Sequence, residues 1–96
     1  MRARFIKTDG TDEVRELTER LSLSELQAAV GGYIEAVDLT YPEQDGTWTT
    51  MWVNEEGKVN DLPFNQKATE IARPGVHIFG DDVIVGDVVL TDYDDD

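Results

Sequence analysis

Cysteine is absent from the chain, and histidine and serine are scarce. Without cysteine the protein has no disulfide, no thiolate metal ligand and no thiol nucleophile. His77 is the only histidine, and Ser22 and Ser24 are the only serines. A serine nucleophile needs a base within hydrogen-bond reach, so a catalytic triad with a serine and a histidine could draw on these three residues alone. We therefore expect a protein that is not an enzyme and that binds no metal and no cofactor.

Long apolar runs are missing as well. No stretch approaches the roughly 18 to 20 apolar residues that a membrane span requires. The basic residues Arg2, Arg4 and Lys7 are not followed by the apolar segment of a signal peptide. These absences predict a cytoplasmic protein that does not bind membranes.

Bases are few, and acids dominate the chain. There are 8 lysines and arginines against 21 aspartates and glutamates, which gives a formal net charge of −13. Residues 1–20 hold five bases and five acids, so the whole excess of acids follows them. Such a surface repels nucleic-acid phosphates and anionic lipids and attracts basic proteins. The sequence predicts no direct nucleic-acid binding, and it predicts an acidic interaction surface whose candidate residues are Asp81, Asp82, Asp87, Asp92 and Asp94.

The length predicts one domain. With 96 residues, 40% of them hydrophobic, the chain has enough apolar side chains for a single core. We expect this domain to cover residues 1–92 and the acidic residues 93–96 to form a flexible tail. The fold class that we expect is α+β, with a small, mostly antiparallel sheet of four to five strands and two short helices.

Alternating and β-branched residues predict the strands. Asp9-Gly10 is typical of a tight turn, and residues 13–19 after it are either a returning strand or a short helix. The last strand is nearly all apolar, so it is expected to be central and covered on both faces. The predicted strands are residues 2–8, 33–39, 48–53 and 83–90.

Capping signals predict the helices. Ser22 and Glu25 have the spacing of a capping box, and Gly31-Gly32 ends the helix that they begin. Pro63 is expected in the first turn of a second helix. The apolar stripe of the first helix is predicted to contain Leu23, Leu26 and Val30, and that of the second Phe64, Ala68, Ile71 and Ala72.

Three further patterns have ordinary structural explanations. The acids from Asp92 to Asp96 resemble the start of a calcium loop, but the chain ends before the glycine and the closing glutamate of such a loop. Asp45, Glu56 and Lys58 match the loose spacing of a metal-dependent nuclease, which the negative charge disfavours. Trp48 and Trp52 are expected on one face of a strand, where they fill a core more often than they form a binding patch.

Four segments together resemble a known family. They are residues 26–35, 54–58, 62–69 and 82–88, and in this order and spacing they are similar to the domain-of-unknown-function family 3846. That family comprises short proteins of bacteriophages, plasmids and their bacterial hosts. The resemblance implies a phage or mobile-element protein in the cytoplasm of a bacterial host, with no established activity and no catalytic residues. The polar matches that folding explains least are Glu35, Glu55, Glu56, Lys58 and Asn65.

Two hypotheses about function follow, and the oligomeric state stays open. The first is an interaction protein whose acidic surface binds a basic host protein, in the extreme as a mimic of DNA. The second is a small-ligand or nucleotide-binding protein, a sponge, with a pocket near the second helix. The candidate ligand-binding residues of that pocket are Glu35, Glu55, Lys58 and Asn65. An anionic ligand would require Lys58, Lys67 and Arg73 to gather, and adaptation to high salt would explain the acids without any partner.

Overall fold

Two hairpins supply four of the five strands of the sheet. The computed structural model describes residues 1–39, 47–72 and 83–93. In the first hairpin β1 (Arg2–Ile6) pairs with β2 (Asp12–Glu16), and the turn between them contains Gly10 at a φ of 94°. The second hairpin is β3 (Ile34–Asp38) with β4 (Thr50–Asn54). The segment after the first turn is therefore a strand, and the alternative of a short helix there is wrong.

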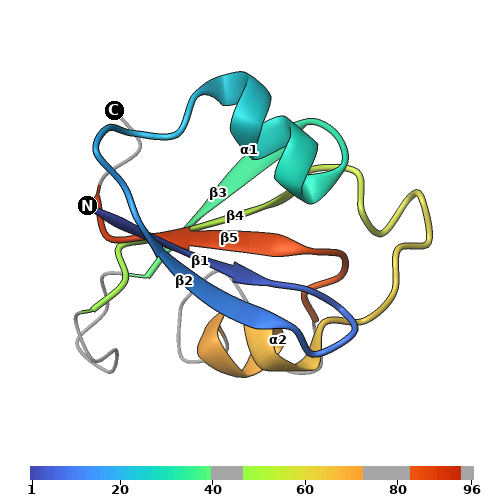
Figure 1. Cartoon of the computed structure of the whole chain (residues 1–96). Helices are drawn as coiled ribbons and strands as arrows, with labels where there is room; N and C mark the ends of the chain where they lie inside the picture. Colours follow the sequence, from blue (N-terminus) through green and yellow to red (C-terminus); the bar gives the residue numbers. More distant parts are fainter. Residues whose placement is uncertain (40–46, 73–82, 94–96) are drawn as a thin grey trace.

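The last strand joins the two hairpins (Figure 1). β5 (Val88–Thr91) lies between β1 and β4, which gives the strand order β2-β1-β5-β4-β3 with every neighbouring pair antiparallel. All four residues of β5 are buried, so the prediction of a central strand covered on both faces is confirmed for this stretch. The α+β fold with an antiparallel sheet and two helices is confirmed as well.

Helix α1 (Leu23–Val30) covers one face of the sheet (Figure 1). Its capping box is formed as predicted: Ser22 Oγ accepts from the amide of Glu25 over 3.1 Å, and Glu25 Oε1 accepts from the amide of Ser22 over 2.9 Å. Gly31 ends the helix in the left-handed conformation at a φ of 82°, which glycine adopts at little cost. The core on this face contains Ala3, Leu26, Trp52 and Val89.

Leu23 does not belong to the buried stripe of α1. Its side chain is 60% exposed, whereas Leu26 and Val30 are buried. Leu21, which precedes the capping residue, packs against the core cluster that contains Leu26. A hydrophobic residue just before the cap often packs against the fourth helical residue, and here this contact replaces the one predicted for Leu23.

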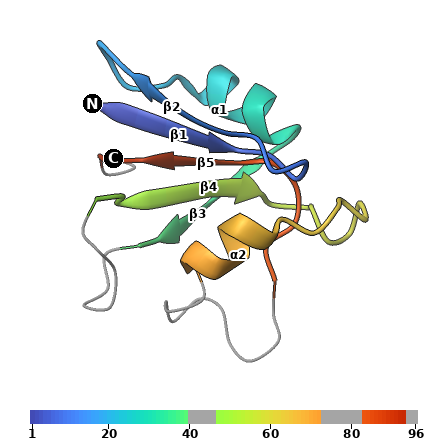
Figure 2. The same ribbon diagram turned by 60° about the horizontal axis from the view of Figure 1, so that its bottom comes forward.

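Helix α2 (Gln66–Ala72) covers the opposite face (Figure 2). Ala68 and Ala72 are buried there, and Ile71 packs against the same cluster. The core on this face is the larger one: Ile6, Val37, Leu39, Met51, Val53, Ala68, Ala72, Ile84, Val88 and Leu90.

The second helix begins later than predicted. Asn65 Oδ1 accepts from the amide of Ala68 over 3.1 Å, as N-cap residues do, so Pro63 lies before the helix rather than in its first turn. Phe64 consequently falls outside the helical stripe, and its side chain is 50% exposed. The proline signal indicated the region of the helix start, whereas the polar cap determines the residue.

The apolar run before β5 is also not all strand. Val85 forms an isolated bridge with Phe64, and Gly86 adopts a φ of 80°, which breaks the extended conformation. The backbone groups of Ile84 bond instead to Asn65 and Thr69 near the start of α2. The predicted strand over residues 83–90 is therefore wrong for 83–87 because this stretch holds α2 in place.

The two tryptophans lie on opposite faces of the sheet. Trp52 is 7% exposed on the α1 side, and its Nε1 donates to Thr91 Oγ1 over 3.1 Å. Trp48 packs against the core on the α2 side, with the Arg2 guanidinium 5.3 Å from its ring centre. The prediction of a shared face is wrong because β4 begins only at Thr50, so strand alternation does not extend back to Trp48.

The chain is anchored as far as Tyr93. Tyr93 Oη accepts a hydrogen bond of 2.9 Å from the amide of Leu21, and the Arg20 guanidinium lies 4.9 Å from the centre of its ring. The remaining tail residues 94–96 lie outside the described residues, as does the predicted helix end at Pro74-Gly75. Neither described helix is long and apolar enough to cross a bilayer.

Candidate functional site

A pocket of about 280 Å³ opens on the α2 side of the sheet, beside the edge strand β3. Three of the four predicted ligand-binding residues, Glu35, Glu55 and Lys58, line it. Its other lining residues are Ala36, Val37, Val53, Asn54, Val59, Val83, Ile84 and Val85. The structure therefore brings together residues that are 23 positions apart in the sequence, from Glu35 to Lys58.

Strand register places Glu35 and Glu55 on the same face as diagonal neighbours. Glu35 lies opposite Val53 in the β3–β4 ladder, and Glu55 follows Val53 by two residues. The amide of Glu55 donates to the carbonyl of Tyr33 over 2.8 Å, so strand pairing continues to this position. Residues in such a diagonal relation are about 7 to 8 Å apart and face the same way. Neither glutamate side chain has an ion pair within the described ranges.

The walls of the pocket are aliphatic. Val37, Val53 and Ile84 are buried and belong to the larger core. Val59 is 82% exposed. The site therefore combines an apolar interior with two negative groups, an arrangement typical of binding pockets.

The turns after β4 form one wall, and two contacts fix them. Asn54 Oδ1 accepts from the amide of Glu56 over 2.8 Å, while its Nδ2 donates to the carbonyl of Val30 at the end of α1 over 3.2 Å. Gly57 packs so closely that a Cβ atom there would lie 2.8 Å from Val85 Cγ2. Glycine at this position is needed for close approach, not only for the turn that the sequence predicted.

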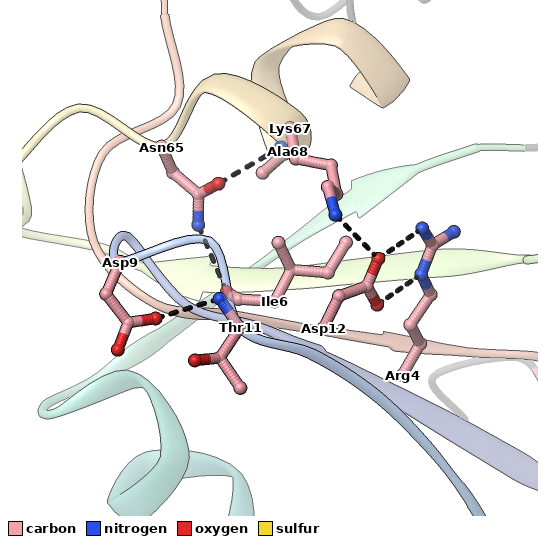
Figure 3. A network of polar contacts seen from close by, with 8 residues as sticks. All are labelled: Arg4, Ile6, Asp9, Thr11, Asp12, Asn65, Lys67 and Ala68. Carbon is pink, nitrogen blue, oxygen red and sulfur yellow. Dashed lines mark hydrogen bonds and ion pairs between the residues drawn. The ribbon is translucent and has the colours of Figure 1, made fainter.

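Asn65 does not line this pocket, because its side chain is fully used in the fold (Figure 3). It is 1% exposed, and its Nδ2 donates to the carbonyl of Ile6 over 3.1 Å and to that of Gly86 over 2.9 Å. Together with the bond from the Ala68 amide, these contacts join α2, β1 and the segment before β5. Asn65 thus has a structural explanation that its sequence position did not reveal.

The lysines do not gather into an anion-binding cluster. Lys58 lines the pocket, whereas Lys67 Nζ lies 3.1 Å from Asp12 Oδ2, which also pairs with Arg4 over 2.7 Å (Figure 3). The hydrogen bond from Arg4, assisted by Lys67, lowers the pKa of Asp12 to about 2. Arg73 lies outside the described residues. Lys58 and Lys67 therefore do not form the cluster of bases that an anionic ligand would require.

Two of the predicted surface acids hold the central strand. Asp87 Oδ1 accepts from the amide of Thr8 over 3.0 Å before β5, and Asp92 Oδ1 accepts from the amide of Arg2 over 2.8 Å after it. Asp92 Oδ2 also lies 3.5 Å from Arg2 Nε. Asp81, Asp82 and Asp94 lie outside the described residues.

Sequence reasoning missed the apolar part of the site. Val59 stands between Lys58 and Asn60 in a stretch of turn residues, and an isolated aliphatic residue there was the available signal. The contribution of Val83 to Val85 could not be predicted, because that stretch was assigned to a strand.

No cluster of metal-ligating side chains forms in residues 1–39, 47–72 and 83–93. No group of three or more histidine, aspartate and glutamate residues in these ranges could hold a metal ion. Of the residues with the nuclease spacing, Lys58 lines the pocket beside β3 and Glu56 lines a different one. Asp45 and His77 lie outside the described residues.

Comparison with known proteins gives one match. The family model described as "Domain of unknown function (DUF3846)" matches residues 1–96, which is the entire sequence. No curated protein and no solved structure matches the chain.

Proposed function

The chain belongs to the DUF3846 family of domains of unknown function, and we propose that it is a non-catalytic interaction protein whose acidic surface binds a basic partner protein. The observation that supports this proposal most is that most of the described basic side chains form ion pairs with acids of the chain itself. Other carboxylates are thereby left for a partner.

Internal ion pairs occupy most of the positive side chains that the structure describes. Arg2 pairs with Asp92, Arg15 pairs with Glu13 over 2.8 Å, and Asp12 holds both Arg4 and Lys67. Arg2, Arg15 and Arg20 also stack on the rings of Trp48, Phe5 and Tyr93.

Several carboxylates remain without an ion pair in the described part of the chain. Two groups among them are Glu16 and Glu19 near β2, and Glu35, Glu55, Glu56 and Asp61 around the end of the second hairpin. Of the second group, Glu35 and Glu55 line the pocket together with the exposed Val59, and Glu56 lines a neighbouring hollow together with the exposed Tyr33. Exposed apolar residues next to unpaired charges are typical of protein-binding surfaces.

The net charge of −13 supports a basic partner. It accelerates encounter with a positive surface and makes binding sensitive to salt, because exposed charges are screened within about 8 Å at physiological ionic strength. A basic host protein that normally binds nucleic acid is a suitable target, so the proposal includes competition with DNA. The setting is the cytoplasm of a bacterial host of a phage or mobile element.

A small-ligand function is the second candidate. It is favoured by the meeting of Glu35, Glu55 and Lys58 in one pocket. Pockets that bury drug-sized ligands measure about 300 to 1,000 Å³, and this one, at about 280 Å³, falls just below that range. Without a cluster of bases it suits a small cationic ligand better than a nucleotide.

The test is capture followed by quantitative binding. Proteins retained from host lysate by the tagged chain are identified by mass spectrometry, and the retained basic protein is purified and titrated with the chain between 50 and 300 mM salt. We expect one-to-one binding that weakens steeply with salt, and weaker binding of the E35Q/E55Q variant than of the matched E16Q/E19Q control. An affinity that does not change over this salt range would contradict the proposal.

A further inference from the structure

We infer that the Glu35–Glu55 pocket receives one arginine side chain of the partner protein. The inference rests on the proposed function and specifies its chemistry: the guanidinium lies between the two carboxylates, and the methylene stem lies against the valines.

The charge of the pocket calls for one cation. Glu35 and Glu55 contribute two negative charges and Lys58 one positive charge, so the lining carries a net charge of −1. Lys58 has a further interaction of its own, whereas neither glutamate has an ion pair in the described ranges. One arginine would neutralise the net charge of the lining and would offset the repulsion between the two carboxylates.

The geometry favours a guanidinium over an ammonium group. Glu35 in β3 and Glu55 just after β4 are diagonal neighbours, so a group bound between them is within reach of both side chains. A guanidinium presents five N–H donors in a planar fork and can serve two carboxylates at once. An ammonium group is a point charge that is more strongly hydrated, so it gains less from this arrangement.

The apolar walls suit the stem of the side chain. Val37, Val53 and Ile84 form a buried floor. Arginine commonly buries its methylene groups along apolar surface while its charged end contacts polar groups. The volume of about 280 Å³ accommodates one long side chain but falls below the usual range for a drug-sized ligand.

The experiment titrates the chain with N-acetyl-arginine methylamide and follows backbone amides by NMR. The analogues of citrulline, which is uncharged and nearly isosteric, and of lysine serve as comparison probes. We expect saturable shifts at Glu35, Val53 and Glu55 with the arginine probe, in the millimolar range, and weaker binding of the lysine probe. Binding should become about tenfold weaker in E35Q/E55Q, because charge-assisted hydrogen bonds are lost, and should be unchanged in E16Q/E19Q. Unchanged amide positions elsewhere in the spectrum show that the variants fold.

Two results would overturn the inference. One is a citrulline probe that binds as well as the arginine probe, and the other is shifts scattered over acidic residues outside the pocket. If the chain bound its basic partner in a salt-dependent way but the arginine probe did not bind in the pocket, this inference would be overturned and the proposed function would stand. Saturable binding of arginine in the pocket, without any salt-dependent partner, would instead contradict the proposed function.

Discussion

Asn65 Nδ2 donates a hydrogen bond of 3.1 Å to the carbonyl oxygen of Ile6, and this buried contact ties the beginning of α2 to the end of β1. The same side chain bonds to Gly86 and to the amide of Ala68. All three partners belong to the backbone. One amide group therefore joins α2, β1 and the segment before β5.

We predict that Asn65→Ala lowers the free energy of unfolding by roughly 3 kcal/mol, since each buried group left unpaired costs about 1 to 3 kcal/mol. Urea unfolding measures the change. Gln66→Ala is the matched control, because Gln66 is exposed and its side chain, within the described residues, bonds only to Glu70 over 3.3 Å. If Asn65→Ala were as stable as the control, the structural role of Asn65 would be wrong.

The pair of Asp12 with Arg4 predicts a pH dependence. The pKa of Asp12 is lowered to about 2 in the folded chain, whereas an unfolded aspartate titrates near about 3.9. A carboxyl group with a lowered folded pKa stabilises the fold above the unfolded pKa and loses this contribution as the pH falls toward the folded pKa. The contribution is therefore complete above about pH 5 and disappears between about pH 4 and pH 2.

We expect Asp12→Asn to cost about 1 kcal/mol at pH 6, because the ion pairs of Asp12 are partly exposed to solvent. The difference from the wild type should vanish near pH 2. Unfolding by urea across this pH range checks both statements, with Glu16→Gln on the same strand as the control. A cost that persisted unchanged at pH 2 would show that Asp12 acts through packing rather than charge.

Glu35 and Glu55 repel each other across the β3–β4 ladder. Neutralising either one by substitution with glutamine should stabilise the fold by a few tenths of a kcal/mol at low salt. The gain should disappear at about 1 M salt, where the screening length is about 3 Å. Thermal unfolding at the two salt concentrations measures it. Glu13→Gln is the control and should not stabilise, because Glu13 pairs with Arg15.

The tryptophans should differ in fluorescence. In Trp48→Phe the remaining Trp52 is buried, so its emission should be blue-shifted and resistant to acrylamide. In Trp52→Phe the remaining Trp48 is only partly buried and should be quenched more readily. Trp52→Phe should also cost about 2 kcal/mol, through lost volume and the lost bond to Thr91. Equal quenching of both variants would contradict the placement of the two rings.

Local signals in the sequence predicted much of the fold. The capping box at Ser22 and the glycine at Gly31 are short-range devices, so they could be read directly. The start of α2 could not, because Asn65 is chosen as the cap by contacts with Ile6 and Gly86, which are 59 and 21 residues away. The turn at Asp9-Gly10 was predicted, but the residues after it were left open between a strand and a helix, because β2 is an exposed edge strand without a buried face.

The site was predicted in part. Glu35, Glu55 and Lys58 were selected because folding did not explain them, and the β3–β4 register brings them together. Asn65 was selected for the same reason, yet its role depends on long-range contacts with backbone groups that sequence patterns do not show. Sequence patterns also did not show that Asp87 and Asp92 have structural roles that the unpaired acids lack. These two aspartates accept hydrogen bonds from the backbone of the first strand and of the turn after it, and such long-range contacts are not visible in the sequence.

The central position of β5 has a consequence for biosynthesis. While Val88–Thr91 is still inside the ribosome, the hairpins β1–β2 and β3–β4 share no strand, and the inner edges of β1 and β4 lack their partner. Such open edges can pair with other nascent chains. The sheet closes only when Thr91 pairs with Ala3. The domain is therefore protected from pairing with other nascent chains only after β5 has emerged from the ribosome.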